Sequence, residues 1–208
     1  FKDQIDGTSG ALNYLNVLSE AVLDPQYVRE YDMTGDILIP LNAKHAPINE
    51  ASFNCQSGRR FAIVVPHVDA DTKLGEITEF STVQVWSLGP HGDGRIYLIH
   101  AWKERVQWDG ICSAIGQIKT LFNVKNIIIH HTDIAERLAR EVGKTGGTSL
   151  SGKGMSLNEM AADLQNLWIE SKVHFPCHSK GVEWRMFAES DLLAWTGADG
   201  DEPVTVVA

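Results

Sequence analysis

Several carboxylates stand beside predicted strands, at positions where a metal ion could be bound. Asp69 ends the first apolar run, and Glu79 opens the next one after an acidic turn. Asp133 follows a later run, and Asp201 and Glu202 follow the last predicted helix. Two divalent ions such as Mg²⁺ or Mn²⁺, which prefer oxygen ligands, can activate water for attack on a phosphodiester. The acids therefore form a candidate two-ion site, and solvated loop acids are the alternative interpretation.

Two adjacent histidines end the fourth apolar run, "KNIIIHH". Neighbouring residues on a strand point to opposite faces, so at most one of the two can face a given site. His130 is the candidate metal ligand, and a packed or surface histidine is the alternative. No HExxH or HxH pattern in the sequence supports zinc.

A Gly/Ser/Thr-rich stretch, "GKTGGTSLSGKG", invites comparison with a phosphate-binding loop. It satisfies G-x-x-x-x-G-K, but Gly154 stands where such a loop needs Ser or Thr for magnesium. The stretch also follows a predicted helix, whereas the phosphate loop follows a strand. We therefore expect a loop that touches substrate and no nucleotide site.

The elements that would position these residues alternate between strand and helix. The first three strands are joined by short links and form an antiparallel meander, and later strands alternate with amphipathic helices. This order predicts an α/β fold with a mixed five-stranded sheet and helices on both faces. If the first and fourth strands are neighbours, the acids that follow them converge. The predicted strands are 59–69, 81–88, 95–102, 125–131 and 172–176, and the predicted helices are 109–122, 132–142, 156–168 and 182–195.

Composition and the amino-terminal segment further limit the possible functions. The 208 residues carry a net charge of −9, which argues against a general nucleic-acid coat, because such proteins cluster Lys and Arg. No apolar run is long enough to span a membrane, and no signal peptide is evident. Three cysteines without a CxxC pair suggest reduced thiols in a cytoplasm. We expect residues 1–58, with a helix near 11–23 and irregular chain beyond it, to be a linker or docking arm, and residues 59–208 to be the main domain.

At this point the chain resembles the nuclease domain of the large terminase subunit of tailed bacteriophages, which has a ribonuclease-H-like fold. The resemblance covers residues 60–208 and depends on the order and spacing of four segments. These are "VDADTKLGEITEFSTVQVW", "GRIYLIHAWKERVQW", "SGKGMSLNEMAADLQNLWIESKVHFP" and "LLAWTGADGDEPV".

The resemblance implies a metal-dependent endonuclease that cuts concatemeric double-stranded viral DNA during genome packaging in the host cell cytoplasm. Asp69 and Asp201 would hold the metals, and Asp133 or His130 would complete the set. Partners would be double-stranded DNA, the terminase ATPase domain, the small terminase subunit and the portal. Auxiliary acids would be Glu79 and Glu202, and candidate contacts to the DNA backbone would be Lys144 and Lys153, for which solvated lysines are the alternative.

The sequence also departs from the family pattern at two positions of the expected site. His130 stands where the family places a Glu, and Thr205 replaces a second Asp of the closing motif. Two alternatives therefore stay open. One is a catalytically inactive ribonuclease-H-like module that binds DNA or packaging partners, and the other is a different phosphoryl-transfer nuclease of the same fold, such as a recombination nuclease or a transposase-like protein.

Overall fold

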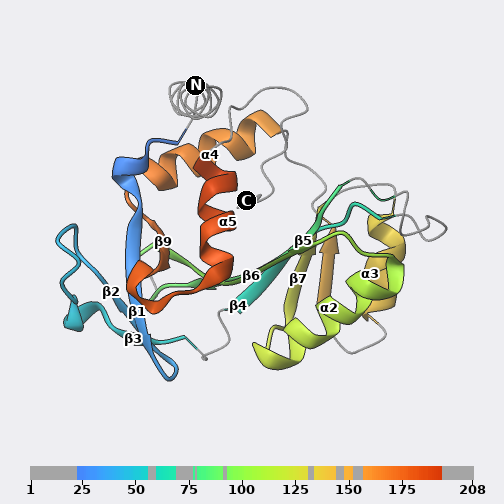
Figure 1. Ribbon diagram of the computed structural model, residues 1–208, viewed down its shortest axis with the longest axis horizontal. Helices are drawn as coiled ribbons and strands as arrows, with labels where there is room; N and C mark the ends of the chain where they lie inside the picture. Colours follow the sequence, from blue (N-terminus) through green and yellow to red (C-terminus); the bar gives the residue numbers. More distant parts are fainter. Residues whose placement is uncertain are drawn as a thin grey trace, which may run out of the picture.

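The computed structural model describes residues 23–55, 60–68, 77, 79–90, 93–130, 134–143, 148–151 and 157–193. Within these residues the chain forms one mixed sheet with helices packed on both of its faces (Figure 1). The helix predicted near residues 11–23 lies almost wholly outside the described residues.

Nine strands pair in the order β3-β2-β1-β9-β6-β5-β4-β7-β8 among the described residues. The antiparallel pairs are β1 with β2, β2 with β3, β4 with β5, and β5 with β6; the remaining neighbours are parallel. The strands are β1 (Arg29–Thr34), β2 (Ile37–Pro40), β3 (Phe53–Asn54), β4 (Arg60–Val65), β5 (Ser81–Leu88), β6 (Ile96–Glu104), β7 (Asn126–Ile129), β8 (Thr148–Ser151) and β9 (Val173–Pro176).

The five strands β6-β5-β4-β7-β8 carry the arrangement that defines the ribonuclease-H-like fold. Three consecutive antiparallel strands are followed by two that run parallel to the first of the three. The predicted fold class is therefore confirmed. The predicted fifth strand, 172–176, is β9 and lies between β1 and β6, so β8 takes the fifth place in this arrangement. The antiparallel strands arise from consecutive apolar runs, and the parallel strands need crossovers to reach their places.

Two hydrophobic cores lie on the two faces of the sheet. The first contains Ile111 and Ile115 from α2 and Leu138 from α3, and the second contains Trp168 from α4 and Ala188 from α5. These residues recur at helical spacing, which explains why the sequence predicts all four helices. The helices are α2 (Trp108–Leu121), α3 (Ala135–Gly143), α4 (Leu157–Ile169) and α5 (Glu183–Leu193), with short 3₁₀ turns at η1 (Pro25–Tyr27), η2 (Asn49–Ala51) and η4 (His178–Lys180).

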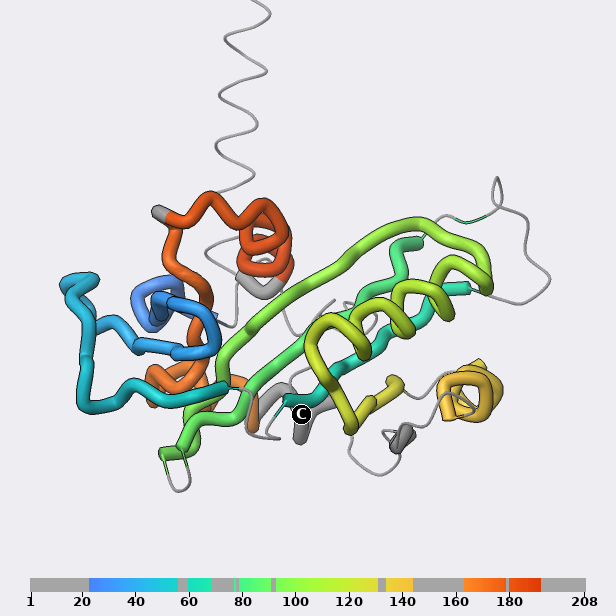
Figure 2. The backbone as a smooth tube through the Cα atoms, turned by 90° about the horizontal axis from the view of Figure 1, so that it is seen from below, coloured from blue at the N-terminus to red at the C-terminus, as the bar shows by residue number. Residues whose placement is uncertain are grey.

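Three local expectations were wrong. Residues 29–54, expected to be irregular, form β1 to β3, which join the sheet beside β9 (Figure 2). The Gly-rich stretch contains β8, which pairs with β7 through its backbone although Leu150 is its only large apolar residue. Asp109, expected from the sequence to cap the helix that follows it, lies in the first turn of α2, whose N-cap residue is Gln107. The predicted boundary at residue 58 stays a prediction, but the sheet itself continues across it.

A buried histidine in β9 leads to a prediction about acid stability. His174 is 3% exposed and stacks on Tyr97, with 4.7 Å between ring centroids. Burial lowers the pKa of His174 from 6.5 to about 4, although the nearby Glu30 carbonyl acts in the opposite direction. Between about pH 6.5 and pH 4, His174 therefore binds a proton in the unfolded chain but not in the folded chain. Stability should fall as the pH drops from about 6.5 to about 4, by at most about 3 kcal/mol.

This prediction is checked by urea unfolding of the wild type and of His174→Phe at a series of pH values. The phenylalanine keeps the stacking on Tyr97 but binds no proton, so the loss of stability over this pH range should shrink. An unchanged loss in the variant would assign the effect to other groups.

Candidate functional site

The ends of four strands meet along one border of the sheet. Val65 at the end of β4 pairs with Thr82 of β5, which pairs in turn with Lys103 near the end of β6. On the other side of β4, Val64 pairs with Ile129, the last residue of β7. We call this border the carboxyl rim and define it as residues 65–68, 79–82, 103–105 and 129–130. The predicted adjacency of the first and fourth predicted strands is therefore confirmed.

Two members of the predicted metal set lie on the described part of the rim. Glu79 precedes β5, and His130 follows β7. The other predicted site residues lie outside the described residues, so their arrangement stays a prediction. These are Asp69, Asp133, Asp201, Glu202, Lys144 and Lys153.

Glu79 is bound by a histidine from the end of β4. His67 Nδ1 lies 2.6 Å from Glu79 Oε2, and the His67 backbone N–H donates to Ser81 Oγ at 3.0 Å. Ser81 is buried, so this second bond fixes the backbone of His67 against the start of β5. The Glu79 side chain is 68% exposed, and it is therefore held in place while accessible from solvent.

His130 extends the pairing of β7 with β4 beyond the last residue of the strand. Its backbone N–H donates to the Val64 carbonyl, with 2.8 Å between N and O. Ile129 is fully buried, and alternation along the chain places His130 on the opposite face of the sheet. The half-buried imidazole is thus fixed at the rim by the backbone.

The end of α5 reaches the same rim through an ion pair. Lys103 Nζ lies 2.7 Å from Asp191 Oδ2, and both side chains are largely buried. Lys103 is separated from Val65 by one intervening strand, so the two backbones are roughly 10 Å apart. The last turn of α5, from which the chain continues toward the closing acids, is therefore held beside the end of β6.

An exposed aromatic ring with two cations adds a feature that the sequence analysis missed. Phe80 is 41% exposed, and the guanidinium carbon of Arg105 lies 4.5 Å from the centre of its ring. Lys103 Nζ lies 5.2 Å from the same ring. A usable signal was present, because "KER" directly follows the third predicted strand, at the border where the second strand begins.

Glu79 and His130 are the potential metal ligands of the predicted set on the described part of the rim. Within the described part of the chain, no group of three His, Cys, Asp or Glu side chains is close enough to hold a metal ion. Glu79 supplies hard oxygen atoms and His130 an imidazole nitrogen, a combination compatible with Mn²⁺. The roles of Glu79 and His130 as metal ligands therefore stay predictions.

Similarity to known proteins is found among solved structures. No family model and no curated protein sequence matches the chain. Among solved structures, the large terminase nuclease of thermophilic phage G20c with bound magnesium is 14% identical, with a TM-score of 0.43, covering 85% of this chain and 76% of that one. The large terminase of thermophilic bacteriophage D6E is 9% identical, with a TM-score of 0.45, covering 67% and 34%. Thermus thermophilus RuvC is 13% identical, with a TM-score of 0.27, covering 57% and 63%. All three likenesses are in structure, at 9–14% sequence identity.

Proposed function

We propose that this chain is a metal-dependent endonuclease that cuts double-stranded DNA. The observation that supports the proposal best is the carboxyl rim itself. It places the ends of β4 and β7 side by side, and Lys103 on the same rim binds Asp191 in the last turn of α5. The predicted ligands follow these three elements in the sequence. A ribonuclease-H-like topology with acids after its first strand and after its last helix suits phosphodiester hydrolysis.

In this proposal Asp69 and Asp201 hold two ions of Mg²⁺ or Mn²⁺, and Asp133 or His130 completes the ligand set. Glu79 and Glu202 are auxiliary acids. When bound, the ions would supply activated water and stabilise negative charge on the phosphate.

The chain's own residues would keep this site in order before substrate arrives. His67 orients Glu79, because its imidazole contacts the Glu79 carboxylate and its backbone N–H donates to Ser81 Oγ at the start of β5. Lys103 holds Asp191 and with it the end of α5. Groups fixed in this way lose little freedom when substrate binds, which favours catalysis.

The wider role follows from the same proposal. The resemblance in sequence favours a terminase large-subunit nuclease that cuts concatemeric viral DNA in the host cytoplasm. The ATPase domain, the small terminase subunit and the portal would be its partners. No helix among the described residues is long and apolar enough to cross a membrane.

One observation favours a second candidate function. His130 occupies the position after β7 where the family pattern expects a Glu, and it replaces an oxygen ligand with a nitrogen ligand. A ribonuclease-H-like module that binds DNA or packaging partners without cutting is therefore the alternative. A junction- or end-specific nuclease of the same fold is a further alternative. The plasmid-cutting assay distinguishes it from the other two candidates.

Removal of divalent metal should abolish plasmid cutting. We expect supercoiled plasmid to be nicked and linearised in Mg²⁺ or Mn²⁺, and to stay intact when EDTA is present, because phosphodiester attack requires the ions. Gel electrophoresis measures the conversion. DNA binding without cutting in either metal would favour the inactive module, and cutting confined to junctions or ends would favour a recombination-type nuclease.

A further inference from the structure

The rim carries a positive charge that no acid among the described residues neutralises. Its neighbouring acids already have basic partners, since Glu79 contacts His67 and Asp191 contacts Lys103. Arg105 pairs with no carboxylate within ion-pair distance among the described residues, and its exposed guanidinium lies against Phe80. In a chain with a net charge of −9, an unneutralised arginine beside candidate catalytic residues is a local exception.

The direction of the side chains keeps the adjacent acid away from this charge. Along β6 successive side chains alternate between the two faces of the sheet, so Lys103 and Arg105 share one face and Glu104 lies on the other. Glu104 lines a groove of about 330 Å³ with α2 residues such as Ser113. The positive surface therefore stays on the face that carries α5.

The contact with Phe80 prepares Arg105 for a particular ligand. A guanidinium stacked on an aromatic ring keeps the N–H groups at its edge available, and two of them can bind one phosphate together. The ring also limits the rotation of a long side chain, which lowers the entropy lost on binding. A lysine at the same place would offer a point charge without this fork.

We propose that Arg105, held by Phe80, binds a backbone phosphate of the DNA strand that lies along the carboxyl rim. This inference rests on the proposed function and adds to it a substrate-binding residue outside the predicted metal set. Phe80 is a positioning residue, because it acts through the arginine. Lys103 contributes less charge to the DNA, because Asp191 neutralises it while fixing α5.

The test is fluorescence anisotropy with a fluorescein-labelled DNA duplex in EDTA, so that binding is measured without cutting. Arg105→Gln should raise the Kd about tenfold, as expected for loss of a charge-assisted bidentate contact. The slope of log K against log salt should fall in magnitude by about 1, because one phosphate contact is lost. Arg105→Lys and Phe80→Leu should each raise the Kd about threefold and keep the slope, because the charge remains.

Lys125→Gln is the matched control. Lys125 is an exposed cation at the start of β7, at the opposite end of that strand from the rim. Lys125→Gln removes one positive charge, as Arg105→Gln does, so any effect of net charge alone appears in both variants. We expect its Kd to stay within about twofold of the wild type, as for a charge outside the contact surface.

The outcomes separate this inference from the proposed function. If the wild type binds DNA and cuts plasmid while Arg105→Gln behaves like Lys125→Gln, the inference is wrong and the nuclease proposal stands. If the wild type neither binds nor cuts DNA, both are wrong. Weaker binding with a reduced salt slope in Arg105→Gln alone supports the inference whether or not the protein cuts.

Discussion

Replacement of Asp69 by alanine should lower the rate of plasmid nicking by at least about a thousandfold, because metal ligation at the phosphate is worth several kcal/mol of transition-state stabilisation. Asp69 follows β4, the strand that lies between β5 and β7 at the centre of the carboxyl rim. No other strand end is adjacent to both Glu79 and His130. We therefore expect this acid to be the least replaceable member of the predicted set.

The control for this experiment is Asp71→Ala. Asp71 belongs to the same acidic turn and carries the same charge, but it has no predicted ligand role. Nicking should persist in Asp71→Ala, and DNA binding in EDTA should persist in both variants. An Asp69→Ala protein that nicks nearly as fast as the wild type would refute the assigned role.

Replacement of Arg185 by methionine should lower the free energy of unfolding by about 3–5 kcal/mol, the usual cost of leaving one member of a buried ion pair without its partner. Arg185 is 2% exposed and Glu30 7% exposed, and Arg185 Nη1 lies 2.7 Å from Glu30 Oε1. Arg185 also donates to the Pro176 carbonyl and, through Nε, to Glu189 Oε2 at 2.9 Å. The arginine thus joins α5 to β1 and β9.

The pKa of Glu30 explains how this loss should depend on pH. Burial acts to raise the pKa, but the hydrogen bonds from Arg185 and His45 and the charge of Arg185 outweigh it, so the pKa lies below the ordinary value of 4.5. A lowered pKa means that the stabilisation is complete above about pH 4.5 and is lost as the pH falls through the folded-state pKa. The difference between wild type and Arg185→Met should therefore shrink in strong acid.

Two further variants decide whether the cost comes from the unpaired charge. The double variant Glu30→Met with Arg185→Met removes both members and should recover most of the lost stability. Lys180→Met breaks the exposed pair with Asp32, in which the lysine is 51% exposed, and should cost less than about 1 kcal/mol. Equal losses in Arg185→Met and Lys180→Met, measured by urea unfolding, would show that burial does not govern the effect.

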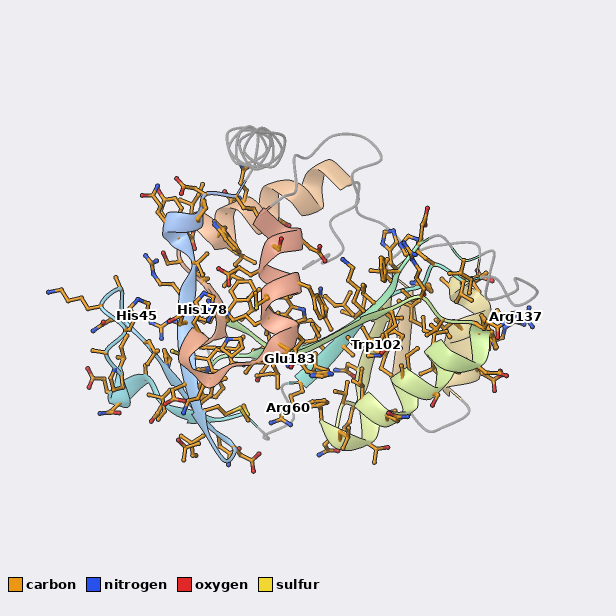
Figure 3. All side chains as sticks on the ribbon, viewed as in Figure 1. His45, Arg60, Trp102, Arg137, His178 and Glu183 are labelled. Carbon is orange, nitrogen blue, oxygen red and sulfur yellow. The ribbon has the colours of Figure 1, made fainter. Side chains whose placement is uncertain are left out.

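The ion pair at Arg185 also bears on the candidate site. It anchors the first half of α5, and the pair between Lys103 and Asp191 anchors the second half. Figure 3 places His178, near this buried pair, on the side of the molecule formed by β1 to β3, and Arg137 at the opposite end. A helix fixed at both ends is a suitable support for acids that must return to the rim.

The sequence by itself determined the elements whose signals are local. The apolar runs predicted β4 to β7 and β9, and the spacing of Ile111, Ile115 and Ile118 predicted α2, because periodicity is readable within a few turns or strand repeats. It also led to the expectation that β4 and β7 are neighbours, since a meander followed by crossovers has few allowed arrangements. The remaining predicted ligands, Asp69 among them, stay predictions.

Only the tertiary structure decided which distant residues share the carboxyl rim. Lys103 and Asp191 lie 88 residues apart in the chain, and Glu30 and Arg185 lie 155 apart. β8 has little apolar character of its own and forms because β7 offers it a backbone partner, while β1 to β3 find theirs in β9. Pairing across such separations depends on the strand order of the whole sheet, and local periodicity does not carry that order. The same order places Phe80 beside Arg105, which is why this contact emerged only from the fold.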